Sequence, residues 1–169
     1  MKTLLLGMGN PILTDDSVGV RLAGDVADRL AGDEVAGTAR AAELDVVREC
    51  SVGGLELIHV LAGYERVIII DSIRTVGGKP GDWYRFTAAS LRETMNLSNV
   101  HDANFATALE LGRRMGARIP PDEQIHLLAV EVEENATFGE TLSESLAAAY
   151  PGVLEEIATE VRSMLEDVS

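Results

Sequence analysis

The sequence predicts an α/β fold built around a mostly parallel sheet. Short apolar segments of strand length alternate with longer segments in which apolar residues recur every three or four positions. Strands that alternate with helices are typical of parallel sheets, because a helix then makes each crossover connection. The length, 169 residues, suits a domain that buries roughly two-thirds of its unfolded surface. We therefore expect a single domain over residues 1–169.

The N-terminal half is expected to hold three strands and two helices. The clearest strand is the apolar segment 67–70, which we expect to end at Asp71. The clearest helix is 17–30, because its apolar residues lie four apart from Val18 to Leu30. The expected elements are strands at 3–6, within 41–52 and at 67–70, and helices at 17–30 and from Gly53–Gly54 onward.

The C-terminal half begins with a loop at 72–82, which is rich in glycine and proline. Residues 83–86 alternate between apolar and polar side chains and predict a short strand. In the next helix, Phe105, Leu109 and Met115 are expected to face inward. The remaining expected elements are helices at 103–115 and 151–165 and a strand at 125–132.

The charge excludes several classes of partner. The chain has 28 acidic and 14 basic residues, a net charge of −14, which repels nucleic acids and anionic membranes. Its apolar segments are far shorter than the ~20 residues of a membrane-spanning helix. We therefore expect a cytoplasmic protein that binds neither nucleic acid nor membrane. Cys50 is the only cysteine, so no disulfide forms within one chain, and a buried thiol is expected.

The turn after the first strand contains Gly7 and Gly9 and is followed by the acidic pair Asp15–Asp16. A strand, a Gly-x-Gly turn and a helix also begin dinucleotide-binding folds, but Ile12 occupies the position of their third glycine. The acidic pair disfavours a pyrophosphate as well. One aspartate of the pair is expected to cap the helix, and the other is a candidate site carboxylate.

Three side chains are candidate metal ligands. Asp71 follows an apolar strand, where a carboxylate either binds a ligand or bonds to its own backbone, and the sequence leaves both open. His101 lies in a polar segment before a helix, whereas His59 and His126 have apolar neighbours and are expected to pack in the core. Asp16, Asp71 and His101 would form an incomplete shell suited to Zn, Ni, Co, Mn or Fe. Parallel sheets bind ligands beyond the carboxyl ends of their strands, which fits this set.

Several segments resemble the NiFe hydrogenase maturation endopeptidases. The most specific is Gly7-x-Gly9-Asn10-x-x-x-x-Asp15-Asp16-x-x-Gly19. The others are the segment 51–57, the strand end 69–72 and His101 before a helix. Many family members carry Glu where this chain has Asp16 and Gly where it has Ser17, so the carboxylate is shorter here by one methylene.

The resemblance implies both a fold and an activity. The fold is a three-layer sandwich, a twisted, mostly parallel sheet with helices on both faces, of the phosphorylase/hydrolase-like kind. The activity is endopeptidase cleavage of the C-terminal extension from the hydrogenase large-subunit precursor, after nickel insertion. Asp16, Asp71 and His101 then serve as catalytic and metal-binding residues. The substrate presents the nickel, and Zn or Cd is expected as a surrogate.

Two other functions remain open at this point. Residues 6–11 also resemble the start of bacterial peptidyl-tRNA hydrolases, although this chain has no histidine before His59 and its charge disfavours tRNA. A non-catalytic, metal-dependent assembly checkpoint is the second alternative. The general base is unassigned among Asp15, Asp16 and Asp71.

Overall fold

The computed structural model describes residues 1–35, 43–94 and 100–167 and contains a five-stranded sheet of order β2-β1-β3-β5-β4. The pairs β1–β2, β1–β3 and β3–β5 are parallel, and β4 is antiparallel to β5. The mostly parallel sheet that the sequence predicts is therefore confirmed. The strands are β1 Thr3–Met8, β2 Leu44–Cys50, β3 Arg66–Ile73, β4 Trp83–Thr87 and β5 Ile125–Glu131.

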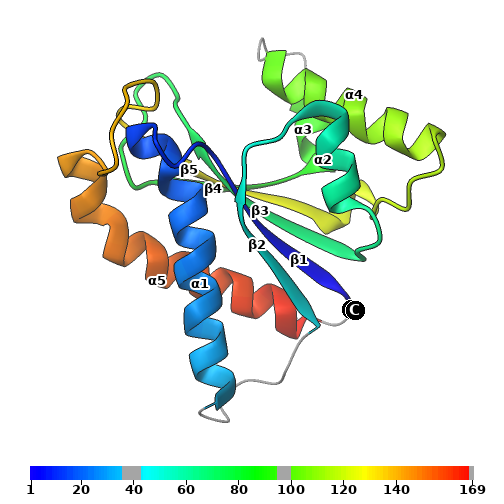
Figure 1. Ribbon diagram of the computed structural model, residues 1–169, viewed down its shortest axis with the longest axis horizontal. Coiled ribbons are helices and arrows are strands. Elements are labelled where there is room, and N and C mark those ends of the chain that lie inside the picture. The colour runs from blue at the N-terminus through cyan, green and yellow to red at the C-terminus, as the bar shows by residue number, and fades with distance from the viewer. Residues whose placement is uncertain (36–42, 95–99, 168–169) are drawn as a thin grey trace.

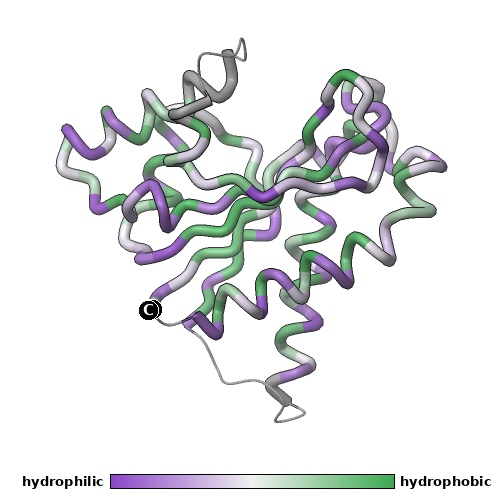
Figure 2. Tube along the Cα trace, turned by 180° about the vertical axis from the view of Figure 1, so that it is seen from behind, coloured by the Kyte–Doolittle hydropathy of each residue, from purple (hydrophilic) through white to green (hydrophobic). Residues whose placement is uncertain are grey.

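Helices cover both faces of the sheet (Figure 1). Alternate strand residues divide between two cores: Leu5 and Ile68 pack toward α1 and α5, and Leu6 and Ile69 pack toward α2 and α4. Figure 2 shows the most hydrophobic residues concentrated along the central strands. The three-layer arrangement is confirmed. The helices are α1 Val18–Val35, α2 Gly54–Leu61, α3 Ala88–Thr94, α4 Val100–Arg114 and α5 Glu144–Glu166, with short 3-10 helices η1 Thr14–Ser17 and η2 Asp122–Gln124.

Strand β3 extends further than its neighbour β1. The last pair between them is Gly7 with Ile70, whereas β3 stays paired with β5 as far as Ile73 with Glu131. The prediction that the strand ends at Asp71 is therefore wrong, because pairing with Ala129 of β5 carries Asp71 within the strand. On its β1 side, however, β3 has no strand partner from Asp71 onward among these described pairs. From β1 the chain continues to β2 on one side, and from β3 it continues to β4 and β5 on the other. Such sheets bind ligands at the point between two strands whose connections diverge in this way.

Glycine fixes the close approach of α1 to the sheet. A Cβ atom on Gly19 would lie 2.3 Å from the carbonyl oxygen of Met8 and 2.4 Å from that of Ile70. Gly9 adopts φ +134°, and its Cβ atom would lie 2.0 Å from the carbonyl oxygen of Asp16. The glycine that brings helix and strand together is thus Gly19, in the first turn of α1, and not position 12.

We expect Gly19→Ala to lower the free energy of unfolding by about 3 kcal/mol, the upper end of the cost of overpacking, because two backbone carbonyls would have to move. Gly32→Ala in the same helix is the matched control, since a Cβ atom at Gly32 meets nothing within 4 Å. The free energy of unfolding of that control should rise by roughly 0.5–1 kcal/mol, because alanine has a higher helix propensity than glycine. Urea denaturation measures both; equal effects would show that Gly19 has room for a methyl group.

Three predicted details of the helices are wrong. Helix α5 begins at Glu144 and contains Pro151, because fully buried Leu146 anchors the turns before the proline. Met115 is 72% exposed, since α4 ends one residue earlier. His59 is exposed, because Leu57, Ile58 and Leu61 form the buried face of α2 and His59 falls opposite.

Helix α3 was not expected from the sequence. Its start is capped reciprocally: the Thr87 N–H donates to Ser90 Oγ at 2.9 Å, and the Ser90 N–H donates to Thr87 Oγ1 at 3.1 Å. A Thr-x-x-Ser pattern directly after a strand was the available signal. None of the helices described here is long and apolar enough to cross a membrane.

Candidate functional site

Asp16 lies where the first loop meets the free side of β3. Its Oδ2 accepts a hydrogen bond from the Asn10 N–H at 2.8 Å, and its Oδ1 accepts one from Ser72 Oγ at 2.8 Å. The side chain is half-buried. Each carboxylate oxygen keeps a second lone pair, so two bonds from fixed elements orient the group without exhausting its capacity to bind a cation.

Asp71 is linked to Asp16 through Ser72. It is half-buried, its Oδ1 accepts the Ser72 N–H at 2.8 Å, and the Ser72 hydroxyl bonds to Asp16. Residues alternate along β3, so Asp71 belongs to the face that Val67 and Ile69 turn toward α2 and α4. The structure therefore connects two of the three predicted ligands through Ser72, whose N–H donates to Asp71 and whose hydroxyl donates to Asp16.

His101 is the second residue of α4, and its side chain lies outside the described part of the structure. The sequence placed it before the helix, which is wrong, because α4 begins at Val100. Among the side chains that are described, no group of three His, Cys, Asp or Glu is arranged to hold a metal ion. The complete shell of Asp16, Asp71 and His101 remains a prediction.

Asp15 is fully buried and does not cap its own helix. Its carboxylate accepts hydrogen bonds from the Ser143 N–H at 2.6 Å and from Ser143 Oγ at 2.7 Å. It also accepts the N–H groups of Glu133 and Glu134 at 3.2 and 3.1 Å. Asp15 thus fastens both ends of the segment 133–143. Because Asp15 is fully buried beneath these four donors, whereas Asp16 is half-buried, Asp16 is the member of the pair available to a ligand.

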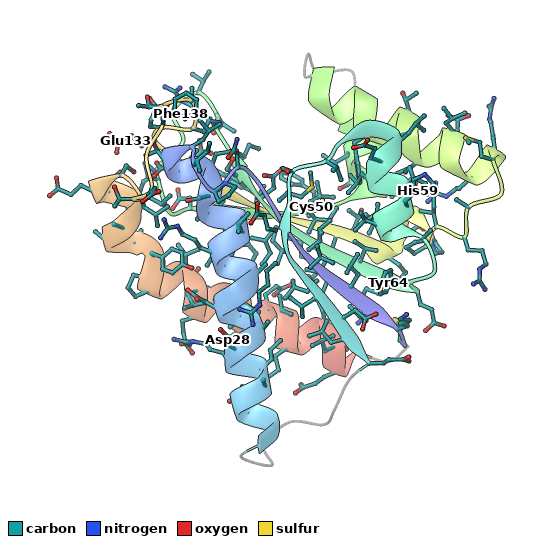
Figure 3. All side chains as sticks on the ribbon, in the orientation of Figure 1. Asp28, Cys50, His59, Tyr64, Glu133 and Phe138 are labelled. Atoms are coloured by element: carbon teal, nitrogen blue, oxygen red, sulfur yellow. The ribbon has the colours of Figure 1, made fainter. Side chains whose placement is uncertain are left out.

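The segment 133–143 pairs with the first loop. The Thr14 N–H donates to the Gly139 carbonyl at 2.9 Å, and the Gly139 N–H donates to the Ile12 carbonyl at 3.0 Å. The Glu134 carboxylate accepts the N–H groups of Ala136 and Thr137, and these bonds lower the pKa of Glu134. Figure 3 shows Glu133 and Phe138 at the end of the molecule where α1 begins. Sequence reasoning missed this contact, because no local pattern links segments more than a hundred residues apart.

A second buried carboxylate supports the loop after β3. Glu131 accepts the Thr75 N–H at 2.6 Å and the Thr75 hydroxyl at 2.8 Å, and it is almost fully buried. A Cβ atom on Gly78 would lie 2.1 Å from this carboxylate. These residues line an open pocket together with Arg74, Pro80 and Ser145. Glu131 therefore holds the loop in place, and the only local sign of this role in the sequence is a glutamate near the end of a predicted strand.

Two other residues behave as the sequence predicts. Cys50, at the end of β2, is a buried free thiol, which does not suit a nucleophile. His126 is buried in β5, and its Nδ1 has no hydrogen-bond partner in the described part of the chain. Burial, helped by the positive charges of Arg85 and Arg66, lowers the pKa of His126 to about 4.

The low pKa of His126 predicts a loss of stability in acid. The unfolded chain takes up this proton near pH 6.5 and the folded chain only near pH 4. The stabilisation is therefore complete above pH 6.5 and is lost as the pH falls toward 4, by about 2 kcal/mol at pH 5. His126→Gln should lose this part of the pH dependence, and His59→Gln, at an exposed position, should keep it. Urea unfolding at pH 7 and pH 5 measures this. The same change in unfolding free energy between the two pH values for wild type and His126→Gln would contradict the prediction.

The fold and site together define a class: an α/β protein with oriented carboxylates at the carboxyl edge of a parallel sheet. A family model described as hydrogenase maturation protease (HycI) matches residues 41–160, more than two-thirds of the chain. The chain belongs to this family. The matched range contains Asp71 and His101, and the loop with Asp16 precedes it. A search of curated proteins found no match.

Solved structures of related proteins have the same fold. The hydrogenase maturating endopeptidase HybD from E. coli is 22% identical with a TM-score of 0.69, covering 97% of this chain and 94% of that one. HybD from Thermococcus kodakarensis is 23% identical with a TM-score of 0.67, covering 96% and 99%. HycI from T. kodakarensis KOD1 is 16% identical with a TM-score of 0.60, covering 98% and 93%. At these identities the likeness establishes the fold.

Proposed function

We propose that this protein is an endopeptidase that removes the C-terminal extension from a NiFe hydrogenase large-subunit precursor after nickel insertion. The observation that carries the proposal is the Asp16 carboxylate, oriented by Asn10 and Ser72 beside Asp71, in a chain of the hydrogenase maturation protease family. Family membership favours this activity over the peptidyl-tRNA hydrolase alternative. We further propose one domain over residues 1–169, acting in the cytoplasm.

In this proposal Asp16, Asp71 and His101 bind the nickel that the precursor already holds. Three protein ligands leave coordination positions for the precursor's own side chains, so the cation is shared and the scissile peptide is held in place. Carboxylate and imidazole ligands also accept Zn or Cd, which are the expected surrogates. Asp16 or Asp71 acts as general base toward water, since the four donors on Asp15 hold it in a structural role.

The direct test incubates the purified protein with a nickel-loaded large-subunit precursor and follows the precursor's mass. We expect loss of the C-terminal peptide with wild type and an unchanged mass with Asp16→Asn. Binding of the precursor without a change in mass would replace the protease with a non-catalytic checkpoint. If the protein neither binds nor cleaves the precursor, the proposed function is overturned.

A further inference from the structure

Two large apolar side chains are exposed beside the candidate site. Ile12 is 51% exposed and Phe138 is 77% exposed. They lie on neighbouring segments, because the Gly139 N–H donates to the Ile12 carbonyl and Leu13 and Gly139 form an isolated β-bridge. We call these two side chains, with the exposed acids Glu133 and Glu140, the Ile12–Phe138 rim.

The loop that carries Phe138 is held firmly on several sides. Asp15 binds it at both ends, the Glu134 carboxylate accepts two of its N–H groups, and the Thr14 hydroxyl donates to the Thr137 carbonyl. The hydrogen bonds of this loop therefore hold Phe138 in an exposed position. Burying an exposed phenyl ring against another apolar surface is favourable. The exposed Phe138 therefore favours binding of an apolar partner.

The charge around the rim narrows the choice of partner. Residues 131–144 include five glutamates and no lysine, arginine or histidine, and three of these glutamates, Glu133, Glu140 and Glu144, are exposed. One exposed cation, Arg21, donates to the Glu140 carbonyl, so the exposed charge of the rim is still mainly acidic. A complementary surface is apolar and basic. A second copy of this chain would bring another acidic rim and a further net charge of −14, so self-association through this surface is disfavoured.

The rim is continuous with the candidate site. Asn10, whose N–H orients Asp16, also accepts the Ile12 N–H through its side chain at 3.1 Å. Ile12 and the Asp16 carboxylate are therefore both bonded to Asn10, so a chain that contacts Ile12 lies close to Asp16. Resting on the proposed function, we propose that the Ile12–Phe138 rim binds an apolar and basic segment of the large-subunit precursor, adjacent to the peptide that is cleaved.

The test compares the double variant Ile12→Ser/Phe138→Ser with Met115→Ser, a matched control at an equally exposed position after α4. With nickel-loaded precursor we expect kcat/KM of the double variant to fall at least tenfold, mostly through KM, and that of Met115→Ser to stay as in wild type. Binding of the precursor in an Asp16→Asn background should weaken by a similar factor. Thermal unfolding confirms that each variant is folded.

A charge variant tests the second half of the proposal. Glu133→Gln/Glu140→Gln should raise KM at low salt and make it less sensitive to ionic strength. If the double variant Ile12→Ser/Phe138→Ser cleaves with the KM of wild type, the proposed role of the Ile12–Phe138 rim is overturned, and the proposed function still stands. A wild type that neither binds nor cleaves the precursor would overturn both. If wild type dimerises and the double apolar variant does not, the rim is an interface between two copies of this chain, and its proposed role in binding the precursor is overturned.

Discussion

Asp16→Asn is expected to lower kcat/KM for precursor cleavage by about 100-fold or more, since even outer-shell partners of metal ligands are worth 10–100-fold. The fold should survive. An asparagine oxygen can still accept the Asn10 N–H, and its amide can donate to the Ser72 hydroxyl, which both donates and accepts. Only the negative charge and its affinity for a cation are lost. Cleavage and the thermal midpoint are measured on the same samples.

Asp45→Asn is the matched control, because it removes the same charge at an exposed position on β2. It should cleave at the wild-type rate. Asp71→Asn and His101→Ala are expected to resemble Asp16→Asn, whereas normal processing by His101→Ala would refute the three-residue metal shell.

Asp15→Asn is expected to have the opposite profile, losing about 2–4 kcal/mol of unfolding free energy. The carboxylate accepts four hydrogen bonds from Ser143, Glu133 and Glu134, whereas asparagine offers one oxygen and turns an N–H group toward other donors. Each buried donor left without an acceptor costs roughly 1–3 kcal/mol. Urea denaturation measures the loss, and proteolysis should cut the segment 133–143 faster.

The neighbouring Asp16→Asn variant serves as the control for this stability effect. Because asparagine can keep both hydrogen bonds of Asp16, this variant should have an unfolding free energy within about 0.5 kcal/mol of wild type. An Asp15→Asn protein of wild-type stability that fails to cleave would reverse the roles of the two aspartates.

Much of the fold could be predicted because its strands are local and apolar. Residues 67–70 form the centre of β3, and the four-residue spacing from Val18 to Leu30 marks α1. The ends of elements were harder to predict, since they depend on partners distant in sequence. Pairing with β5 extends β3 beyond Asp71, and the buried Leu146 starts α5 before Pro151.

The residue types of the candidate site could be predicted from the sequence, but the different roles of its two adjacent aspartates could not. Adjacent aspartates look alike in sequence, yet Asp15 faces donors from the segment 133–143 and Asp16 faces Ser72. Those contacts join residues 56 to 128 positions apart, so no spacing rule identifies them. Gly19 was similarly hidden, because its role depends on carbonyl groups from two different strands.

The rate of cleavage of nickel-loaded precursor, compared with that of metal-free precursor, tests the central claim most directly. If Asp16, Asp71 and His101 share the precursor's nickel, the loaded precursor is cut without added metal. The metal-free precursor should be cut at least ~10-fold more slowly at every protease concentration, because the coordination that aligns the peptide is missing. Equal rates for the two precursors would contradict the claim and leave a peptidase that recognises sequence or shape alone.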